Sequence, residues 1–232
     1  MLDSIALESR LSDVRERIAR AASRAKRDPS SVRLVAVSKT FPSEYIRAAA
    51  AAGQVDFGEN KVQEGLSKMS ETSDLSLRWH LIGHLQSNKA KQAVAFHAIQ
   101  SIDSSSLLQK VEHAANSAGR TVEVLVQVDL AREPTKHGID PQELRALLDV
   151  ADACKAVRLK GLMLLPPAFD DPQGGRPYFS ALRTLRDDLV REGRNPSTLA
   201  ELSMGMSHDF EVAVEEGATL VRVGSAIFGP RT

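Results

Sequence analysis

The sequence has 232 residues, of which 42% are hydrophobic and 26% charged, and its 30 basic and 30 acidic side chains cancel. This composition is typical of a soluble globular protein, and the balanced charge argues against a nucleic-acid-binding surface or an electrostatic membrane anchor. No apolar run approaches the roughly 20 residues that span a bilayer. The single cysteine, Cys154, excludes an internal disulfide, and no spacing of cysteine and histidine resembles a metal site.

Residues 1–28, MLDSIALESRLSDVRERIARAASRAKRD, carry charges throughout and repeat apolar residues at helical spacing. They predict an amphipathic helix that packs on the rest of the protein. The segment does not have the apolar core of a signal peptide, so we expect a cytoplasmic protein.

The rest of the chain alternates short runs rich in β-branched residues with segments of helical periodicity. The short runs predict eight strands, at residues 32–37, 55–57, 77–82, 98–102, 122–128, 159–164, 199–202 and 220–223. The periodic segments predict seven helices, at residues 43–52, 61–70, 87–96, 104–118, 141–151, 176–192 and 209–216. Boundary residues agree with these limits, since Ser104 can cap a helix, Pro141 can start one and Gly53 can end one.

This order predicts an α/β protein, a single (β/α)₈ TIM barrel over residues 1–232, although an open doubly wound sheet has the same alternation. Polar residues favour the barrel because they follow nearly every strand, as in SKT and GHLQSNK, and active sites of such barrels lie at these strand ends. Residues 166–177, PPAFDDPQGGRP, are typical of an insertion after the sixth strand, and no composition shift marks a second domain.

Small residues gather after the last two predicted strands. In ELSMGMSHDF, Ser203, Gly205 and Ser207 lead into a helix, and in VRVGSAIFG, Gly224 and Ser225 follow the eighth strand. The loops after strands seven and eight of such barrels often bind phosphate, because small residues allow close approach and helix N-terminal amides favour an anion. The first segment alone is more typical of a tight turn with a capping residue, but the two together favour a phosphate site.

A lysine follows the first predicted strand, in LVAVSKTFP. The amine of Lys39 could form a Schiff base with an aldehyde, and pyridoxal 5'-phosphate (PLP) carries both an aldehyde and a phosphate. Taken alone, a salt-bridged or snorkelling lysine at the rim of the barrel is the commoner role. Arg222 alternates with Val221 and Val223, so it points either into the barrel or towards solvent, and the sequence leaves both open.

Eight motifs follow one another along nearly the whole chain: AVSKTFP, DFGENKVQE, WHLIGHLQSNK, IDS, VQVDLAREPTKHG, LKGLMLL, LSMGMSHDFEVAV and VRVGSAIFG. In this order they resemble the motifs of the YggS/PROSC family, the pyridoxal phosphate homeostasis proteins. The resemblance implies PLP as the cofactor. It also implies a fold similar to the N-terminal barrel of alanine racemase and of bacterial-type ornithine decarboxylase.

Carried over position by position, the resemblance implies a Schiff base at Lys39 and places Arg222 against the pyridine nitrogen of PLP. The implied phosphate cradle and its loop comprise Ser203, Gly205, Ser207, Gly224 and Ser225, with the backbone amides around Met206. Asn60, His84 and Met163 would line the pocket, although a helix cap, loop structure and core packing are strong alternatives for them. Lys136 and Gly138 match the family's signature loop, and the sequence assigns them no role.

The partner of the ring nitrogen bears on function. An always-charged arginine disfavours a proton on the pyridine ring and so weakens the ring as an electron sink. Alanine racemases share this arrangement but add a β-rich domain and a tyrosine base. This chain stops at Thr232, and its two tyrosines, Tyr45 and Tyr178, lie away from the predicted strand ends.

The resemblance therefore implies a PLP homeostasis protein that stores or delivers the cofactor through an exchangeable Schiff base, without substantial catalytic activity. We expect a monomer that binds neither nucleic acid nor membrane, with apo PLP-dependent enzymes as candidate recipients. Two alternatives stay open. One is a fold-type III PLP enzyme, such as a weak amino-acid racemase that uses His84 or Lys39 as acid and base. The other is a Schiff-base aldolase or sugar-phosphate barrel that uses Lys39 on a different aldehyde.

Overall fold

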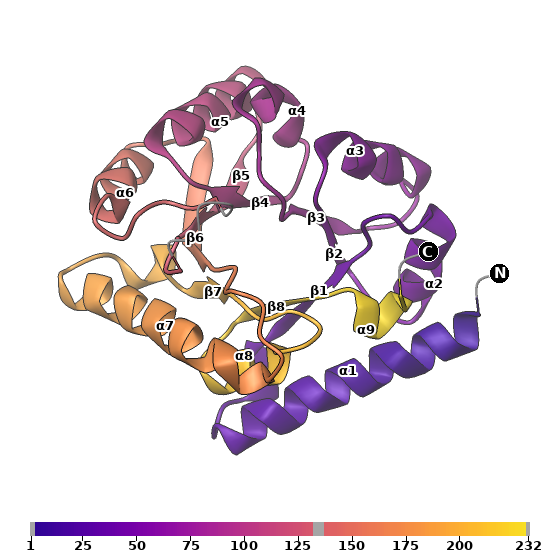
Figure 1. Cartoon of the computed structure of the whole chain (residues 1–232). Helices are drawn as coiled ribbons and strands as arrows, with labels where there is room; N and C mark the ends of the chain where they lie inside the picture. The colour runs from indigo at the N-terminus through magenta and orange to yellow at the C-terminus, as the bar shows by residue number, and fades with distance from the viewer. Residues whose placement is uncertain (1–2, 132–136, 231–232) are drawn as a thin grey trace.

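Eight parallel strands close into a barrel in the computed structural model of the chain, which describes residues 3–131 and 137–230 (Figure 1). The strands follow sequence order around the barrel: β1 (Arg33–Val37), β2 (Asp56–Glu59), β3 (Arg78–Leu81), β4 (Ala98–Ile102), β5 (Val122–Gln127), β6 (Val157–Met163), β7 (Glu201–Ser203) and β8 (Leu220–Val223). β8 pairs with β1, with Leu34 opposite Val221, and this pairing closes the sheet. The predicted barrel is confirmed, and the alternative open sheet is wrong.

The two faces of β8 carry different residues, because successive side chains of a strand point to opposite sides. Val221 and Val223 belong to the large apolar cluster between the strands and the helices. Arg222 between them is buried on the inner side of the barrel. A smaller apolar cluster fills part of the interior and consists of Val35, Leu125, Met163 and Leu220. The interior therefore combines apolar packing with polar groups that need hydrogen-bond partners.

Helices surround the barrel on its outer face (Figure 1). After the first helix they are α2 (Ser43–Ala51), α3 (Val62–Glu71), α4 (Ala90–Ala93), α5 (Ser105–Ser117), α6 (Leu144–Asp152), α7 (Arg176–Arg191), α8 (Phe210–Glu215) and α9 (Ser225–Phe228). The helix predicted at residues 87–96 was too long. A 3₁₀ turn at Ser87–Lys89 precedes α4, and i→i−3 bonds from Ala95 and Phe96 end it. The single turn α9 was not predicted, because four residues are too few to show a helical period.

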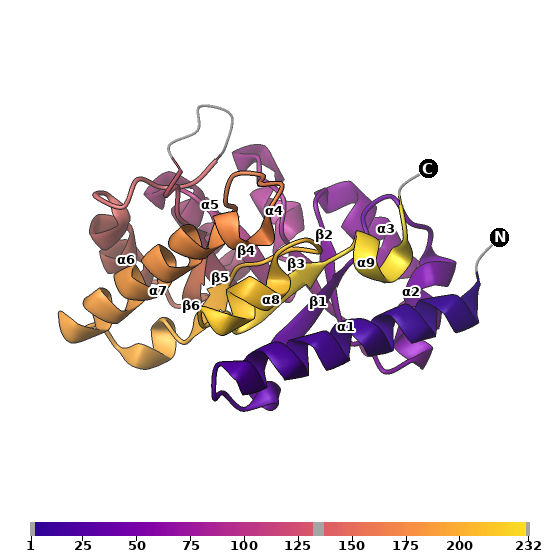
Figure 2. The same cartoon turned by 60° about the horizontal axis from the view of Figure 1, so that its bottom comes forward.

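The predicted N-terminal helix is α1 (Ser4–Arg24), and it packs on the barrel. It starts after Asp3, whose Oδ1 accepts a hydrogen bond of 3.0 Å from the backbone N–H of Ala6. One stripe of the helix is buried, and it includes Leu7, Leu11, Val14 and Ile18. The helix contacts α2, α8 and α9 and lies along the side of the barrel that carries β1 (Figure 2).

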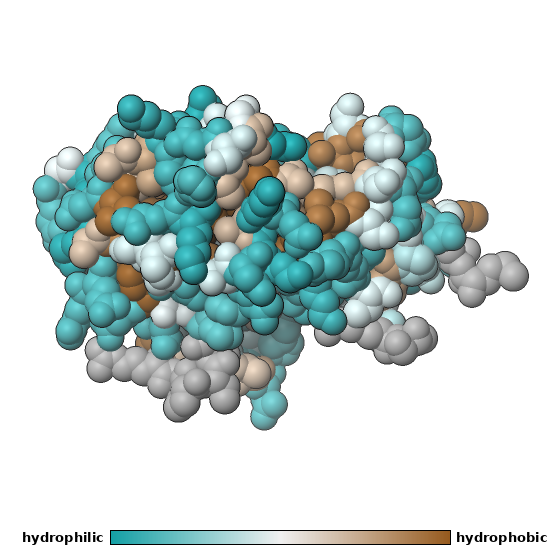
Figure 3. Space-filling view, turned by 90° about the horizontal axis from the view of Figure 1, so that it is seen from above, coloured by the Kyte–Doolittle hydropathy of each residue, from teal (hydrophilic) through white to brown (hydrophobic). Residues whose placement is uncertain are grey.

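The loops and the surface of the molecule bear on two further predictions. Residues 164–175 connect β6 to α7 and include a 3₁₀ turn at Pro172–Gly175, so an insertion does follow the sixth strand. None of the helices in the described ranges is both long and apolar enough to cross a membrane. On the face shown in Figure 3, hydrophobic residues form small groups among hydrophilic ones. Lys136 lies outside the described residues.

Candidate functional site

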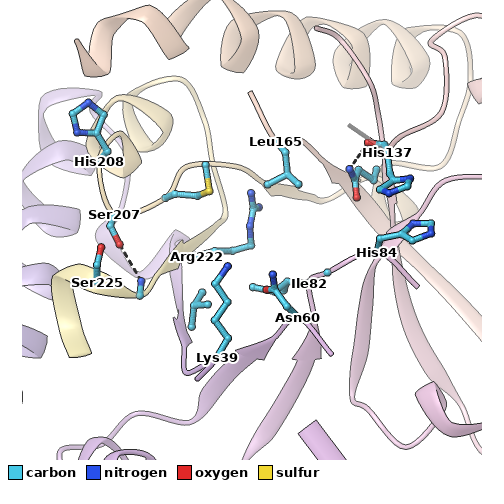
Figure 4. A pocket seen from close by; sticks show the side chains of 15 residues that line it. Lys39, Asn60, Ile82, His84, His137, Leu165, Ser207, His208, Arg222 and Ser225 are labelled. Atoms are coloured by element: carbon cyan, nitrogen blue, oxygen red, sulfur yellow. Dashed lines mark hydrogen bonds between the residues drawn. The ribbon is translucent and has the colours of Figure 1, made fainter. Parts of the chain in front are cut away.

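A cavity of about 530 Å³ lies among the C-terminal ends of the barrel strands (Figure 4). Its volume is within the range of about 300–1,000 Å³ that is usual for small-molecule sites. Lys39 and Arg222 extend into its centre, Ser207 and Ser225 lie on one side, and His84 lies on the other (Figure 4). Side chains from opposite ends of the sequence therefore face the same space.

Lys39 lies half-buried in a tight turn, two residues after the end of β1. The next residue, Thr40, has a φ of 71°, in the left-handed region where a β-branched residue is strained. Two hydrogen bonds hold the turn. The N–H of Thr40 donates to Glu64 Oε1 at 2.6 Å, and the N–H of Phe41 donates to Ser38 O at 3.0 Å. These contacts fix the direction in which the lysine side chain leaves the strand.

A buried ion-pair cluster supports this turn from the helix side. Lys68 Nζ on α3 donates to Ser38 O at 2.8 Å and to Glu59 Oε1 at 2.6 Å. It also lies 2.7 Å from Glu64 Oε1. Burial raises the pKa of Glu59, and the hydrogen bonds from Lys68 and Ser38 offset only part of that effect. Glu64 is less buried, so its bonds from Lys68 and Thr40 outweigh burial and lower its pKa.

Arg222 is only 2% exposed and points into the barrel, which settles the orientation that the sequence left open. Its Nη1 donates to Ser203 Oγ at 2.6 Å, and its Nη2 donates to Leu164 O at 2.9 Å. Burial lowers the pKa of Arg222 to about 10, and the charge of Asp209 opposes this change. The guanidinium is therefore a cation at neutral pH. Since it carries five N–H donors, others are available to a ligand in the cavity.

The wall formed by Ser207, Gly224 and Ser225 carries small groups and backbone amides. Ser207 Oγ accepts hydrogen bonds from the N–H of Gly224 at 3.0 Å and of Ala226 at 3.5 Å. A Cβ at Gly224 would lie 3.2 Å from Val37 O, so glycine allows β8 to continue close against β1. Hydroxyl groups and N–H groups at the start of a helix are a combination that favours an anion.

The loop after β7 is shaped by Gly205 and Asp209. Gly205 has a φ of 92°, and a Cβ there would lie 2.5 Å from the Cβ of Ala213, so no other residue fits without movement. The N–H of Met206 donates to Asp209 Oδ1 at 2.7 Å. Burial raises the pKa of Asp209, against the effect of this hydrogen bond. The backbone amide of Met206, expected in the phosphate cradle, is thus engaged by its own loop.

Two histidines stack on the side of the cavity opposite Ser207 (Figure 4). The ring centroids of His84 and His137 are 3.6 Å apart and the planes differ by 11°. His84 Nδ1 lies 3.3 Å from Asp103 Oδ2, and the ligand atoms of these three residues lie within 4.8 Å of one another. Nearly parallel rings direct their in-plane lone pairs side by side and not towards one point. The arrangement therefore suits ring stacking better than metal coordination.

The structure brings most of the predicted site residues together. Eight of them line the cavity: Lys39, Asn60, His84, Met206, Ser207, Arg222, Gly224 and Ser225. Three lie outside its wall, which corrects their predicted position. Met163 packs in the inner apolar cluster, Ser203 is fully buried against Arg222, and Gly205 turns the loop after β7.

Seven residues that sequence reasoning missed also line the cavity. They are Val37, Ile82, Gly83, Gln127, His137, Leu165 and His208. Most of them lie at the end of a strand or directly after it, and that position was the signal available in the sequence. The apolar ones could not be told from ordinary core residues by their type.

The chain is similar to known proteins over almost its whole length. The family model for the alanine racemase N-terminal domain matches residues 9–232. A pyridoxal phosphate homeostasis protein from Aquifex aeolicus is 44% identical over 223 residues, which cover 96% of this chain and 97% of that protein. The human pyridoxal phosphate homeostasis protein is 40% identical over 231 residues, covering 94% of this chain and 84% of the human one.

Solved structures agree with these matches. PipY of Synechococcus elongatus, in a structure with PLP bound, superposes with a TM-score of 0.85 at 41% identity and covers 96% of this chain and 100% of PipY. An alanine racemase from Clostridium difficile superposes with a TM-score of 0.74, and the match covers 97% of this chain and 56% of the racemase. At 14% sequence identity, this match supports the fold and nothing further. The identities of 44% and 40% to the two homeostasis proteins extend over nearly the full length, and they show that the chain belongs to the pyridoxal phosphate homeostasis protein family, built on the alanine racemase N-terminal domain.

Proposed function

We propose that this chain binds PLP in the cavity at the barrel mouth and acts in PLP homeostasis, storing or delivering the cofactor through an exchangeable Schiff-base link to Lys39. One observation carries the proposal: Lys39 and the buried cation Arg222 extend into the same cavity, beside a wall of small residues (Figure 4). The names of the relatives and the PLP in the PipY structure support it.

The residues of the cavity match the chemical groups of PLP. PLP supplies an aldehyde that condenses with a primary amine with loss of one water. Lys39 would provide that amine, and Arg222, which can only donate hydrogen bonds, would face the pyridine nitrogen. Ser207 and Ser225 would hold the phosphate through their hydroxyl groups, and the N–H of Gly224, which donates to Ser207 Oγ at 3.0 Å, would keep one of those hydroxyls in place. Each group of the cofactor then meets a side chain of complementary character.

An arginine in this place does not by itself forbid catalysis, and it favours a carrier in combination with the missing tyrosine base: neither Tyr45 nor Tyr178 lines the cavity in the described part of the chain. The guanidinium of Arg222 is held by Ser203 and Leu164 and stays positively charged, so a ring nitrogen placed beside it would accept a hydrogen bond and would not gain a proton. An unprotonated ring withdraws electrons less strongly. We therefore propose that the protein has no substantial catalytic activity of its own.

The experiment that tests PLP binding is a titration of the purified protein with PLP, followed by absorbance. We expect a yellow band in the wild type that is absent in Lys39→Ala. Lys160→Ala is the matched control, because Lys160 lies in β6 and pairs with Glu123, away from the cavity. A band that persists in Lys39→Ala would contradict the proposed role of this lysine.

A weak amino-acid racemase of fold type III is the second candidate function. It is favoured by the amine of Lys39 and the imidazoles of His84 and His137, which could move a proton within one cavity. Incubation of the PLP-loaded protein with single-enantiomer alanine, followed by chiral chromatography, separates the two candidates. Turnover that requires both PLP and Lys39 would support the racemase and overturn the carrier.

We also propose that the protein is a monomer. Among the residues in the ranges 3–131 and 137–230, the large hydrophobic side chains that are exposed are only Ile5, Val55 and Met206. They belong to α1, the segment before β2 and the loop after β7, which is little apolar area for a stable dimer. Sedimentation velocity tests this state. Delivery to apo PLP-dependent enzymes and a cytoplasmic location stay predictions.

A further inference from the structure

A chain of buried polar side chains crosses the interior of the barrel beneath the cavity. Its members are Arg222, Ser203, Gln100, His80 and Asp56. They come from β8, β7, β4, β3 and β2, so the chain connects opposite sides of the barrel. None of the five residues is more than 5% exposed. Buried polar groups need partners, and here the partners are one another.

Each link of this chain is within hydrogen-bond distance. Arg222 Nη1 donates to Ser203 Oγ at 2.6 Å, and Ser203 Oγ donates to Gln100 Oε1 at 2.6 Å. Gln100 Nε2 lies 3.1 Å from His80 Nδ1. His80 Nε2 lies 2.8 Å from Asp56 Oδ1. The cavity arginine is thereby coupled to a carboxylate in the lower part of the barrel.

The residues at the two ends of this hydrogen-bonded series determine which groups along it donate and which accept. Arg222 can only donate hydrogen bonds. Burial acts to raise the pKa of Asp56, but the hydrogen bonds from His80 and Arg78 outweigh burial and lower the pKa to about 2. The carboxylate of Asp56 is therefore ionised at neutral pH and can only accept.

The groups between these ends have one arrangement that satisfies them all. His80 must donate through Nε2 to Asp56, so in its neutral form Nδ1 accepts from Gln100 Nε2. The amide oxygen of Gln100 then accepts the hydroxyl proton of Ser203. The lone pairs of Ser203 Oγ are left to accept from Arg222. A flipped amide at Gln100 would leave the hydroxyl of Ser203 without an acceptor in the chain.

We propose that Gln100 is a positioning residue for PLP binding: through Ser203 it fixes the orientation of the Arg222 guanidinium in the cavity. The inference rests on the proposed binding of PLP at this site and adds a residue that does not line the cavity. A guanidinium that is already oriented loses less conformational freedom when a ligand binds, so its orientation contributes to affinity.

The first test compares Gln100→Leu with the wild type by PLP titration, with absorbance as the readout. Leucine keeps similar bulk but removes both hydrogen bonds of the amide. We expect PLP affinity to fall at least about fivefold and the absorbance band of the bound cofactor to shift. Leu125→Ala is the control, because Leu125 is buried in the inner apolar cluster and makes no link in the chain. The control should lose thermal stability but keep the affinity and spectrum of the wild type.

A double-mutant cycle tests whether the effect passes through Arg222. In an Arg222→Ala background, Gln100→Leu should cause no further loss of affinity, because the group that it orients is gone. Equal losses in both backgrounds, or unchanged affinity and spectrum in a folded Gln100→Leu protein, would overturn the proposal. If Gln100→Leu does not fold, Ser203→Ala interrupts the same chain with a smaller change and should weaken binding in the same way.

A measurement without ligand tests the donor and acceptor roles along this hydrogen-bonded series. In ¹⁵N NMR spectra of the protein, His80 should be the tautomer with hydrogen on Nε2 and an unprotonated Nδ1. The opposite tautomer would refute the arrangement and with it the role of Gln100. A wild-type protein that forms no covalent link to PLP would instead refute the proposed function, so the two failures can be told apart.

Discussion

Replacing Asp56 by asparagine should change how the stability of the protein depends on pH. Asp56 is buried in β2, with His80 Nε2 at 2.8 Å and with Arg78 donating to its two oxygens at 2.9 and 2.6 Å. Burial alone would raise its pKa. The hydrogen bonds from His80 and Arg78 outweigh burial, and the pKa falls from 3.8 to about 2.

The sign of the effect follows from this direction. The pKa in the folded protein is below that of the unfolded chain, so ionised Asp56 stabilises the folded state above about pH 4. The stabilisation disappears as the pH falls towards 2. The difference between 3.8 and about 2 corresponds to about 2.4 kcal/mol at neutral pH, of which about 1 kcal/mol is lost by pH 3.

Urea unfolding of the wild type and of Asp56→Asn at about pH 6 and pH 3 measures this contribution. Other carboxylates titrate in both proteins and largely cancel in the comparison. The difference in unfolding free energy between the two proteins should therefore shrink by about 1 kcal/mol from pH 6 to pH 3. A difference that stays the same at both pH values would refute the assignment of Asp56 as an ionised partner of His80 and Arg78.

Three other substitutions have expected outcomes. Lys68→Met should lower the free energy of unfolding, measured by urea denaturation, by about 3 kcal/mol or more, because the buried carboxyl group of Glu59 then has no cation beside it. A loss below about 1 kcal/mol would contradict this expectation. Gly205→Ala should lower the melting temperature more than Gly193→Ala. Both glycines have a positive φ, but only at Gly205 would an added Cβ meet another atom, the Cβ of Ala213 at 2.5 Å. Equal decreases in melting temperature would speak against this close approach. Ser207→Asp should weaken PLP binding at least about tenfold in an absorbance titration, and Ser207→Ala less, because a carboxylate repels phosphate; equal effects would move the phosphate site elsewhere.

The fold could be predicted because each barrel strand is a short apolar run between helical patterns. β4 and β8 have the predicted bounds, and the other strands differ by a few residues at their ends. Periodicity alone did not distinguish a closed barrel from an open sheet, and the polar residues after the strands made that choice. The helix expected at residues 87–96 failed because the pattern of apolar residues does not reveal where the backbone changes to 3₁₀ geometry.

The cavity could be predicted in part because strand ends are recognisable in the sequence. Lys39 and Ser207 lie in the loops that follow β1 and β7, and the barrel brings all C-terminal ends to one face. Met163 shows the limit of that reasoning. Alternation along β6 places its side chain inside the barrel, but the sequence does not give its depth, and it packs with Val35 and Leu125 away from the cavity wall.

The polar chain beneath the cavity could not be predicted at all. Ser203 and Gln100 are 103 residues apart in the sequence and meet only because β7 and β4 face each other across the barrel. Ser203 was expected among the cofactor-binding residues, in the segment that leads to the phosphate cradle, and in the structure its partners are Arg222 and Gln100. Which inward-pointing side chains meet depends on the register and tilt of all eight strands together, and no local pattern encodes that.

The most direct measurement is the location of the covalent PLP link. The purified protein is incubated with PLP, reduced with borohydride, digested and examined by mass spectrometry. We expect a pyridoxyl group on Lys39 and none in the Lys39→Ala variant. A pyridoxyl group on another lysine, such as Lys61 or Lys89 in the neighbouring cleft, with Lys39 unmodified, would contradict the proposed site, and so would the absence of any adduct.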